Sequence, residues 1–275
     1  MPSQIPITIG DGSGEQIGLG RHRPPAPSMV GMTAIAVTDL PHAWDEPEGV
    51  APRGTLILLT GRGETAATYA RFGRRISADA YKVRVVEVDL DDLDATRAAV
   101  SALVADEDLP GPKVLVGSDT GATLAALLVG ELPVDAAVIA GLALPGTASG
   151  EADAGWEDEL EVRSACPTYR GTISADDGFA RGALTAPLPW DEISLSVPEV
   201  PLLVVHGRDD RLTPVGEALK PWVGAPTVEQ HVVEGGRHDI LNDVTHRSVA
   251  ATVILFLERL KLGADLPVIV RRVGR

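Results

Sequence analysis

KVLVGSDTGA, residues 113–122 of this 275-residue chain, joins an apolar run to a helix-forming segment through a turn flanked by two glycines. A tight turn of this kind between a strand and a helix presents its central side chain in a strained, exposed position. Gly117 and Gly121 suit the turn because the helix has to pack closely behind the strand. The central residue is Asp119, and Ser118 stands one position earlier. The stretch therefore predicts a strand–turn–helix unit that presents a carboxylate.

Short apolar runs alternate with helical segments on both sides of this turn. The predicted strands cover residues 55–59, 83–88, 113–116, 136–140, 202–205 and 229–233. The predicted helices cover residues 69–80, 94–106, 122–131, 213–222 and 245–262. Several strands are almost continuously aliphatic, which is typical of a parallel sheet covered on both faces. We therefore expect an α/β fold with a mostly parallel, doubly wound sheet.

Two segments interrupt this alternation. Residues 1–31 are rich in Gly, Pro and Ser and lack apolar periodicity, which predicts a flexible tail. Residues 146–200 are polar and contain several prolines, and this segment is too long for an ordinary connection. We expect it to form a lid inserted before the strand at 202–205. Residues 32–145 and 201–275 then form the core.

Composition excludes several classes of function. The chain has 24 Lys and Arg against 39 Asp and Glu, a net charge of −15, which argues against binding to nucleic acid or an anionic membrane. Its single cysteine, Cys166, permits no intrachain disulfide and fits a reducing compartment. No apolar run approaches the roughly 20 residues of a membrane span, and no signal peptide is apparent. We expect a cytoplasmic protein that acts on a small molecule.

Two further loops carry groups with possible chemistry. Residues 206–214, HGRDDRLTP, follow a predicted strand and contain Asp210. Residues 234–239, EGGRHD, follow the last predicted strand and contain His238. Because ligands bind at the carboxyl ends of strands in open α/β sheets, we expect both side chains to lie near Asp119.

Over residues 35–265 the chain resembles the α/β-hydrolases, in which nucleophile, acid and histidine follow one another in this order. Residues 117–121 match the nucleophile elbow, residues 207–214 the acid loop and residues 236–238 the histidine loop. Residues 58–81 resemble the oxyanion loop and first helix of lysophospholipase and monoacylglycerol lipase relatives. Their HGxGE motif stands here as TGRGE.

The resemblance implies a role for each matching residue. Asp119 occupies the nucleophile position, His238 the base and Asp210 the acid that orients the imidazole. The backbone amides of Arg62 and Thr120 would form the oxyanion hole. The lipase relatives have serine at the nucleophile position, so the aspartate is a departure from their pattern.

Aspartate at the elbow is similar to two other branches, the epoxide hydrolases and the haloalkane dehalogenases. A helix N-terminus favours an ionised carboxylate. Such a carboxylate can attack a saturated carbon and form an ester, which a histidine and water then cleave. Attack on an ordinary ester would instead expel the carboxylate again. The sequence therefore favours opening of an epoxide or displacement of a halide. Epoxide hydrolases usually offer two lid tyrosines, whereas this lid contains only Tyr169.

Several alternatives remain open at this point. An Asp–His pair could move protons in a lyase or cyclase, the chain could bind a ligand without turnover, or Ser118 could serve an ester or lactone hydrolase. Asp209 and Asp239 are alternatives for the acid. Asp119 itself could simply cap a helix, and Arg62 could form an ion pair with it or with a substrate carboxylate.

Other residues complete the set of expectations. In the lid, Trp156, Tyr169 and Trp190 either contact substrate or pack the lid onto the core. His206 is expected to be buried structure. We find no metal-ligand spacing and no dinucleotide-binding motif, and we therefore expect no cofactor.

Overall fold

The computed structural model describes residues 43–147 and 155–274, which build a seven-stranded sheet in the order β1-β3-β2-β4-β5-β6-β7. The strands are β1 (Ala43–Trp44), β2 (Thr55–Leu59), β3 (Lys82–Val86), β4 (Lys113–Asp119), β5 (Ala136–Leu142), β6 (Leu202–Gly207) and β7 (Val228–Val233). β1 pairs antiparallel with β3, and all other pairs in this sheet are parallel. The predicted, mostly parallel sheet is confirmed. The tail predicted at residues 1–31 lies outside the described residues.

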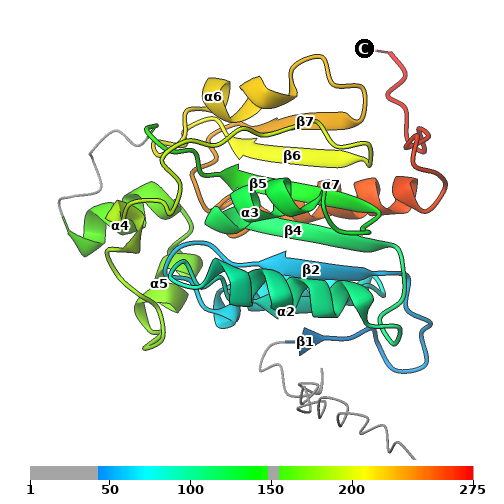
Figure 1. Ribbon diagram of the computed structural model, residues 1–275, viewed down its shortest axis with the longest axis horizontal. Helices are drawn as coiled ribbons and strands as arrows, with labels where there is room; N and C mark the ends of the chain where they lie inside the picture. The colour runs from blue at the N-terminus through cyan, green and yellow to red at the C-terminus, as the bar shows by residue number, and fades with distance from the viewer. Residues whose placement is uncertain (1–42, 148–154, 275) are drawn as a thin grey trace, which may run out of the picture. The chain divides into compact units, whose positions relative to one another are not determined.

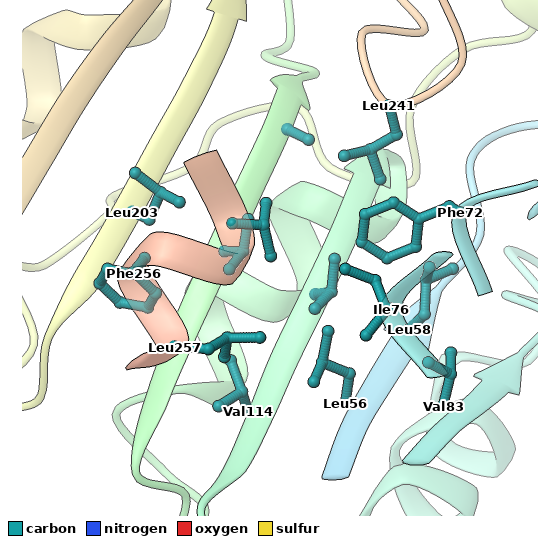
Figure 2. Close-up of a cluster of buried hydrophobic side chains, with 14 of the residues drawn as sticks. Leu56, Leu58, Phe72, Ile76, Val83, Val114, Leu203, Leu241, Phe256 and Leu257 are labelled. Atoms are coloured by element: carbon teal, nitrogen blue, oxygen red, sulfur yellow. The ribbon is translucent and has the colours of Figure 1, made fainter. Parts of the chain in front are cut away.

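Helices cover both faces of the sheet, as Figure 1 shows. They are α1 (Ala70–Ala78), α2 (Leu93–Ala105), α3 (Thr120–Leu128), α6 (Val215–Leu219) and α7 (His246–Leu260), with 3-10 helices η2 (Ala66–Tyr69) and η5 (Lys220–Trp222). A further 3-10 helix, η4 (Ala183–Thr185), lies between β5 and β6. Side chains of β2 alternate between the faces. Leu56 and Leu58 pack in one cluster with α1 and α7, and Ile57 and Leu59 pack in another with α2 and α3. Figure 2 shows part of the first cluster, to which α7 contributes Phe256.

Most helices and strands lie where the sequence predicted them, but one predicted helix is divided and one short strand was not predicted. The predicted strand 55–59 is confirmed residue for residue as β2. The helix predicted at 213–222 is divided, because α6 ends at Leu219 and η5 follows it. Pro221 explains the division, since it has no amide hydrogen for an α-helical hydrogen bond. β1 was not predicted, because two residues are too few to form an apolar pattern.

Between β5 and β6 the chain forms an insertion, defined here as the described residues 155–200. It contains α4 (Trp156–Arg163), α5 (Pro167–Ser174) and η4. α5 begins at a proline, which is favoured in the first turn of a helix. A small apolar cluster, formed by Leu160, Cys166, Tyr169, Ile173 and Phe179, lies inside the insertion. Residues 148–154 of the predicted lid lie outside the described residues.

Across the described ranges, no helix has both the length and the apolar character that crossing a bilayer requires.

Candidate active site

Asp119 lies at the junction of β4 and α3, with backbone angles φ 52° and ψ −120°. A positive φ is uncommon for a residue with a side chain and marks a strained position. Two glycines allow this turn. A Cβ on Gly117 would lie 2.2 Å from the Gly121 carbonyl oxygen, and a Cβ on Gly121 would lie 2.3 Å from that of Leu59. The close packing expected around the predicted turn is therefore present.

The structure brings Asp119, His238 and Asp210 together. His238 Nδ1 lies 2.8 Å from Asp210 Oδ2, and His238 Nε2 lies 3.0 Å from Asp119 Oδ1. All three side chains are buried. Asp210 Oδ1 accepts the backbone amides of Leu212 (2.8 Å) and Thr213 (3.1 Å), which fixes its carboxylate against the imidazole.

The alternatives for the acid lie elsewhere. Asp209 is exposed, and its amide donates to the Gly236 carbonyl. Asp239 is buried, but its carboxylate accepts hydrogen bonds from Arg163 and Tyr169 rather than from His238. Of these three carboxylates, Asp210 is therefore the one that contacts Nδ1 of the imidazole.

Arg62 binds Asp119 with its backbone and its side chain. The amide of Arg62 donates to Asp119 Oδ2 at 2.7 Å, Nε donates to the same oxygen at 2.9 Å, and Nη2 donates to Oδ1 at 2.8 Å. The remaining nitrogen, Nη1, donates to the carbonyls of Leu184 (3.0 Å) and Ala186 (3.3 Å) in the insertion. Of the two ion-pair partners considered for Arg62, the structure shows Asp119.

Of the two amides predicted for the oxyanion hole, that of Arg62 therefore contacts Asp119 itself. Thr120 is fully buried at the start of α3, and within the described ranges its hydroxyl has no hydrogen-bond partner.

Electrostatics in this site favour ionised forms. Burial opposes ionisation of Asp119, but Arg62 and His238 outweigh it and hold the pKa of Asp119 well below its usual range. Burial likewise opposes ionisation of Asp210, while His238 and His206 lower its pKa. For the imidazole of His238, burial is outweighed by Asp210 and Asp119, which raise its pKa to about 10. At neutral pH an imidazolium therefore lies between two carboxylates.

A second buried polar cluster adjoins the triad and was not predicted. It consists of Glu64, Tyr69, Tyr169, Asp239 and Arg163. Tyr169 Oη lies 2.8 Å from Glu64 Oε1 and 2.7 Å from Asp239 Oδ2. Glu64 Oε2 accepts the hydroxyl of Tyr69 and, at 2.8 Å, the amide of Gly61. The sequence marked Glu64 only as part of the TGRGE loop, and no signal pointed to Arg163.

The insertion contacts the loops of the site through both its backbone and its side chains. The carbonyl of Arg163 accepts the amide of Asp239 at 2.8 Å, and the amide of Ala180 donates to the Gly63 carbonyl at 2.9 Å. The Arg163 side chain also donates to the Arg62 carbonyl, from Nη2 at 2.8 Å. These bonds link the insertion both to the loop of Arg62 and to the loop of His238.

The three aromatic residues predicted to contact substrate lie in different surroundings. Tyr169 belongs to the buried polar cluster. Trp156 packs edge-on against Phe179 within the insertion, with ring centroids 5.6 Å apart. Trp190 is half-buried and packs against the apolar cluster on the α2 and α3 face. Contact of these residues with a substrate stays a prediction.

The other singled-out residues have identifiable partners. Ser118 is buried near the Tyr69 phenol, where it lowers the pKa that burial raises. His206 is fully buried as predicted, and its Nε2 lies 3.0 Å from Asp210 Oδ2. Cys166 Sγ accepts a hydrogen bond from Arg71 at 3.4 Å. Within the described ranges, no group of three or more His, Cys, Asp and Glu side chains could hold a metal ion.

Comparison with known proteins identifies the fold. No protein-family model matches the chain, and no curated protein matches it in sequence. Among solved structures, a soluble variant of monoglyceride lipase from Saccharomyces cerevisiae is 15% identical with a TM-score of 0.60, covering 79% of this chain and 90% of its own. Est816, described as an N-acyl homoserine lactone degrading enzyme, is 17% identical with a TM-score of 0.59, covering 78% and 95%.

A third similar structure is the putative non-heme bromoperoxidase BpoC from Mycobacterium tuberculosis H37Rv. It is 17% identical with a TM-score of 0.55, and the alignment covers 79% of this chain and 95% of that one. All three structures belong to the α/β-hydrolase superfamily. The chain therefore has the α/β-hydrolase fold, as predicted from its motifs.

Proposed function

We propose that this chain is a hydrolase of small, partly apolar organic molecules, with Asp119 as a carboxylate nucleophile that displaces a halide or opens an epoxide. The observation that carries the proposal is the different environment of the two Asp119 oxygens. Oδ1 faces His238 Nε2 at 3.0 Å, whereas Oδ2 accepts the backbone amide of Arg62 at 2.7 Å. One oxygen is thus placed to attack, and the other lies against a donor that can stabilise negative charge.

In the first step, Asp119 Oδ1 attacks a saturated carbon, a carbon–oxygen bond forms, and the leaving group departs with the bonding electrons. The contacts of Oδ1 with Arg62 Nη2 and with His238 Nε2 have to break for this attack. A halide leaves without needing a proton, whereas an epoxide oxygen needs an acid. Because the hydroxyl of Tyr169 already lies between two carboxyl groups, halide displacement is the better supported of the two reactions.

The ester formed on Asp119 changes the charge beside His238. Asp119 no longer carries a negative charge, so one of the two carboxylates that raise the pKa of His238 is lost. The pKa of His238 then falls, and the imidazole can release its proton and accept one from water. Asp210 keeps the ring oriented throughout, through its 2.8 Å contact with Nδ1.

In the second step, water activated by His238 attacks the carboxyl carbon of Asp119. Negative charge develops on Oδ2, which already accepts hydrogen bonds from the amide and Nε of Arg62. Donors placed in advance at such an oxygen are a main source of rate acceleration in acyl-transfer steps. Collapse of the intermediate breaks the bond between the carboxyl carbon and Oδ1, and His238 gives the proton taken from water to the departing alkoxide. An alcohol is released, and one oxygen from water stays in the Asp119 carboxylate.

Binding of a ligand without turnover is a second candidate function. Both oxygens of Asp119 accept hydrogen bonds from Arg62, and Oδ1 also contacts His238. A carboxylate neutralised in this way is a weaker nucleophile than a free one. The same imidazolium–carboxylate pair could also move protons in a lyase or cyclase.

Isotope labelling distinguishes nucleophilic catalysis from acid–base chemistry and from ligand binding without turnover. The protein is given haloalkanes and terminal epoxides in ¹⁸O-water for many turnovers, and the peptide containing Asp119 is then analysed by mass spectrometry. Nucleophilic catalysis predicts ¹⁸O in the Asp119 carboxylate, and it predicts that His238→Gln accumulates an ester on the same residue. Asp119→Asn is the matched control and should be inactive. Turnover without label would favour acid–base chemistry, and saturable binding without turnover would favour the ligand-binding candidate.

A further inference from the structure

The hydroxyl of Tyr169 lies between two buried carboxyl groups. Its oxygen is 2.8 Å from Glu64 Oε1 and 2.7 Å from Asp239 Oδ2. A phenol has one proton to donate, and an ionised carboxylate has none. The proton of Tyr169 therefore satisfies only one of the two contacts. The other contact requires a proton on a carboxyl group.

The surroundings assign that proton to Glu64. Arg163 Nη1 lies 3.3 Å from Asp239 Oδ2, and this cation favours a negative charge on Asp239. Glu64 Oε2 accepts the Gly61 amide and the Tyr69 hydroxyl, which leaves Oε1 free to carry a proton and donate it to Tyr169. Burial, aided by the charge of Asp239, raises the pKa of Glu64 to about 7; burial also raises the pKa of Asp239, but there Arg163 and His238 oppose it.

The groups facing Glu64 come from several elements. Tyr69 faces it from η2 and Tyr169 from α5, while Asp239 lies in the loop after β7 and Arg163 at the end of α4. Arg163 also forms an ion pair with Glu159, at 2.9 Å. Arg163 thus lies against two carboxylates, and its partial compensation of a negative charge on Glu64 is outweighed by burial and by the charge of Asp239.

These hydrogen bonds form a ring that joins the two loops of the candidate active site. Glu64 binds the amide of Gly61, beside Arg62, and Tyr169 links Glu64 to Asp239, beside His238. Arg163 closes the ring, because it donates to Asp239 through Nη1 and to the Arg62 carbonyl through Nη2.

We infer that Glu64 and Tyr169 are positioning residues, which set the distance between Arg62 and His238 through a single proton shared by Glu64, Tyr169 and Asp239. The inference deepens the proposed function and rests on it for its effect on catalysis. Loss of the proton leaves two carboxylates against one phenol, so one contact of the ring becomes repulsive. The loop of Arg62 and the loop of His238 then separate.

Amide hydrogen exchange tests the ring without any substrate. Exchange is measured for the two loops and α5 from roughly pH 5 to pH 9, corrected for the intrinsic effect of pH. The unmodified protein should lose about tenfold in protection of these segments above about pH 7. Glu64→Gln should lose the transition, because its amide can donate to Tyr169 at every pH while its oxygen still accepts from Gly61. Tyr169→Phe should show low protection throughout.

The control is Glu107→Gln, since Glu107 is an exposed carboxylate on the molecular surface. It should retain the transition of the unmodified protein. Absence of a transition in the unmodified protein, or an unchanged transition in Glu64→Gln, would overturn the inference. If Glu64→Gln does not fold, the infrared carbonyl band of a protonated carboxyl group, measured in the unmodified protein, tests for the shared proton instead. The band should disappear through about pH 7, and its absence throughout would refute the shared proton.

A catalytic measurement connects the ring to the proposed reaction. With a haloalkane substrate, kcat should fall above about pH 7 in the unmodified protein and stay level in Glu64→Gln. KM should change less than kcat in Tyr169→Phe, because Tyr169 acts through the loops. An exchange transition without any turnover would support the ring and contradict the proposed function. A pH profile identical in Glu64→Gln and the unmodified protein would reject the positioning role.

Discussion

Arg62 donates to Asp119 from its backbone amide, at 2.7 Å to Oδ2, and from its guanidinium, at 2.8 Å from Nη2 to Oδ1. The two contacts have different consequences. The amide remains whatever side chain stands at this position, whereas the guanidinium can be removed by mutation. Substitutions at Arg62 can therefore distinguish the effect of the backbone amide on Oδ2 from the effect of the guanidinium on Oδ1, the oxygen proposed to attack.

Arg62→Met should speed formation of the ester on Asp119 and slow its hydrolysis. Formation becomes faster because Oδ1 loses its contact with Nη2. Hydrolysis should slow by roughly a hundredfold, because Oδ2 keeps the amide but loses the donor Nε. Rapid-quench sampling with intact-mass detection measures both steps. The control is Arg97→Met, since Arg97 pairs with Glu131 on the surface. An unchanged rate of ester hydrolysis would refute the role given to the guanidinium.

Asp119→Asn should lower the pKa of His238 from about 10 toward the value of an ordinary histidine, because one of its two carboxylate partners is removed. Titration of the ring by NMR measures this shift. The raised pKa of His238 also makes the stability of the fold depend on pH. A raised histidine pKa stabilises the fold below its unfolded value near 6.5 and loses this contribution as pH rises through about 10. The Asn variant should lose less stability over that range.

Asp209→Asn is the matched control for this prediction, because Asp209 neighbours Asp210 in sequence but is exposed. It should leave the titration of His238 unchanged. A His238 pKa near that of a free histidine in the unmodified protein would contradict the charge arrangement of the site.

Glu64→Gln should change how stability depends on pH. The pKa of Glu64 rises from 4.5 to about 7, so its stabilising contribution is present below about pH 4.5 and is lost as pH rises through about 7. A shift of this size corresponds to an upper bound of about 3 kcal/mol. Urea unfolding at roughly pH 5 and pH 8 should show this loss in the unmodified protein. The loss of unfolding free energy between these pH values should be smaller in Glu64→Gln. An equal loss in the two proteins would contradict the prediction.

Gly121→Ala should destabilise the fold by several kcal/mol, on the order of a severe core substitution. The added Cβ would meet the Leu59 carbonyl at 2.3 Å, and this atom belongs to the backbone of a central strand. Gly130→Ala is the control, because a Cβ there meets nothing within 4 Å. Thermal unfolding should separate the two variants clearly. A Gly121→Ala variant as stable as Gly130→Ala would show that the turn can widen without cost.

The sequence predicted the core of the fold because its signals are local. The aliphatic run at residues 55–59 and the glycines around Asp119 each specify their structure within a few residues. The order of the elbow, acid and histidine loops then indicated that Asp119, Asp210 and His238 meet at one sheet edge. These features depend on strand ends, which a sequence pattern locates well.

The buried polar cluster could not be predicted in the same way. Glu64 and Tyr169 are 105 residues apart, and Arg163 contacts the Arg62 carbonyl across 101 residues. Arg163 is fully buried although its helix has a polar sequence, so composition gave the opposite expectation. Burial of a charged side chain depends on partners from distant segments, and no local pattern encodes them.

Besides the side chains of Tyr169 and Arg163, the insertion reaches the candidate active site through main-chain atoms, including the carbonyls of Leu184 and Ala186 and the amide of Ala180. Any amino acid except proline supplies an amide donor, and every amino acid supplies a carbonyl acceptor. Side chains at these positions can therefore mutate while these hydrogen bonds to the loops of the candidate active site are retained. Such an arrangement allows the side chains at these three positions to change independently of the geometry of the loop that carries Arg62.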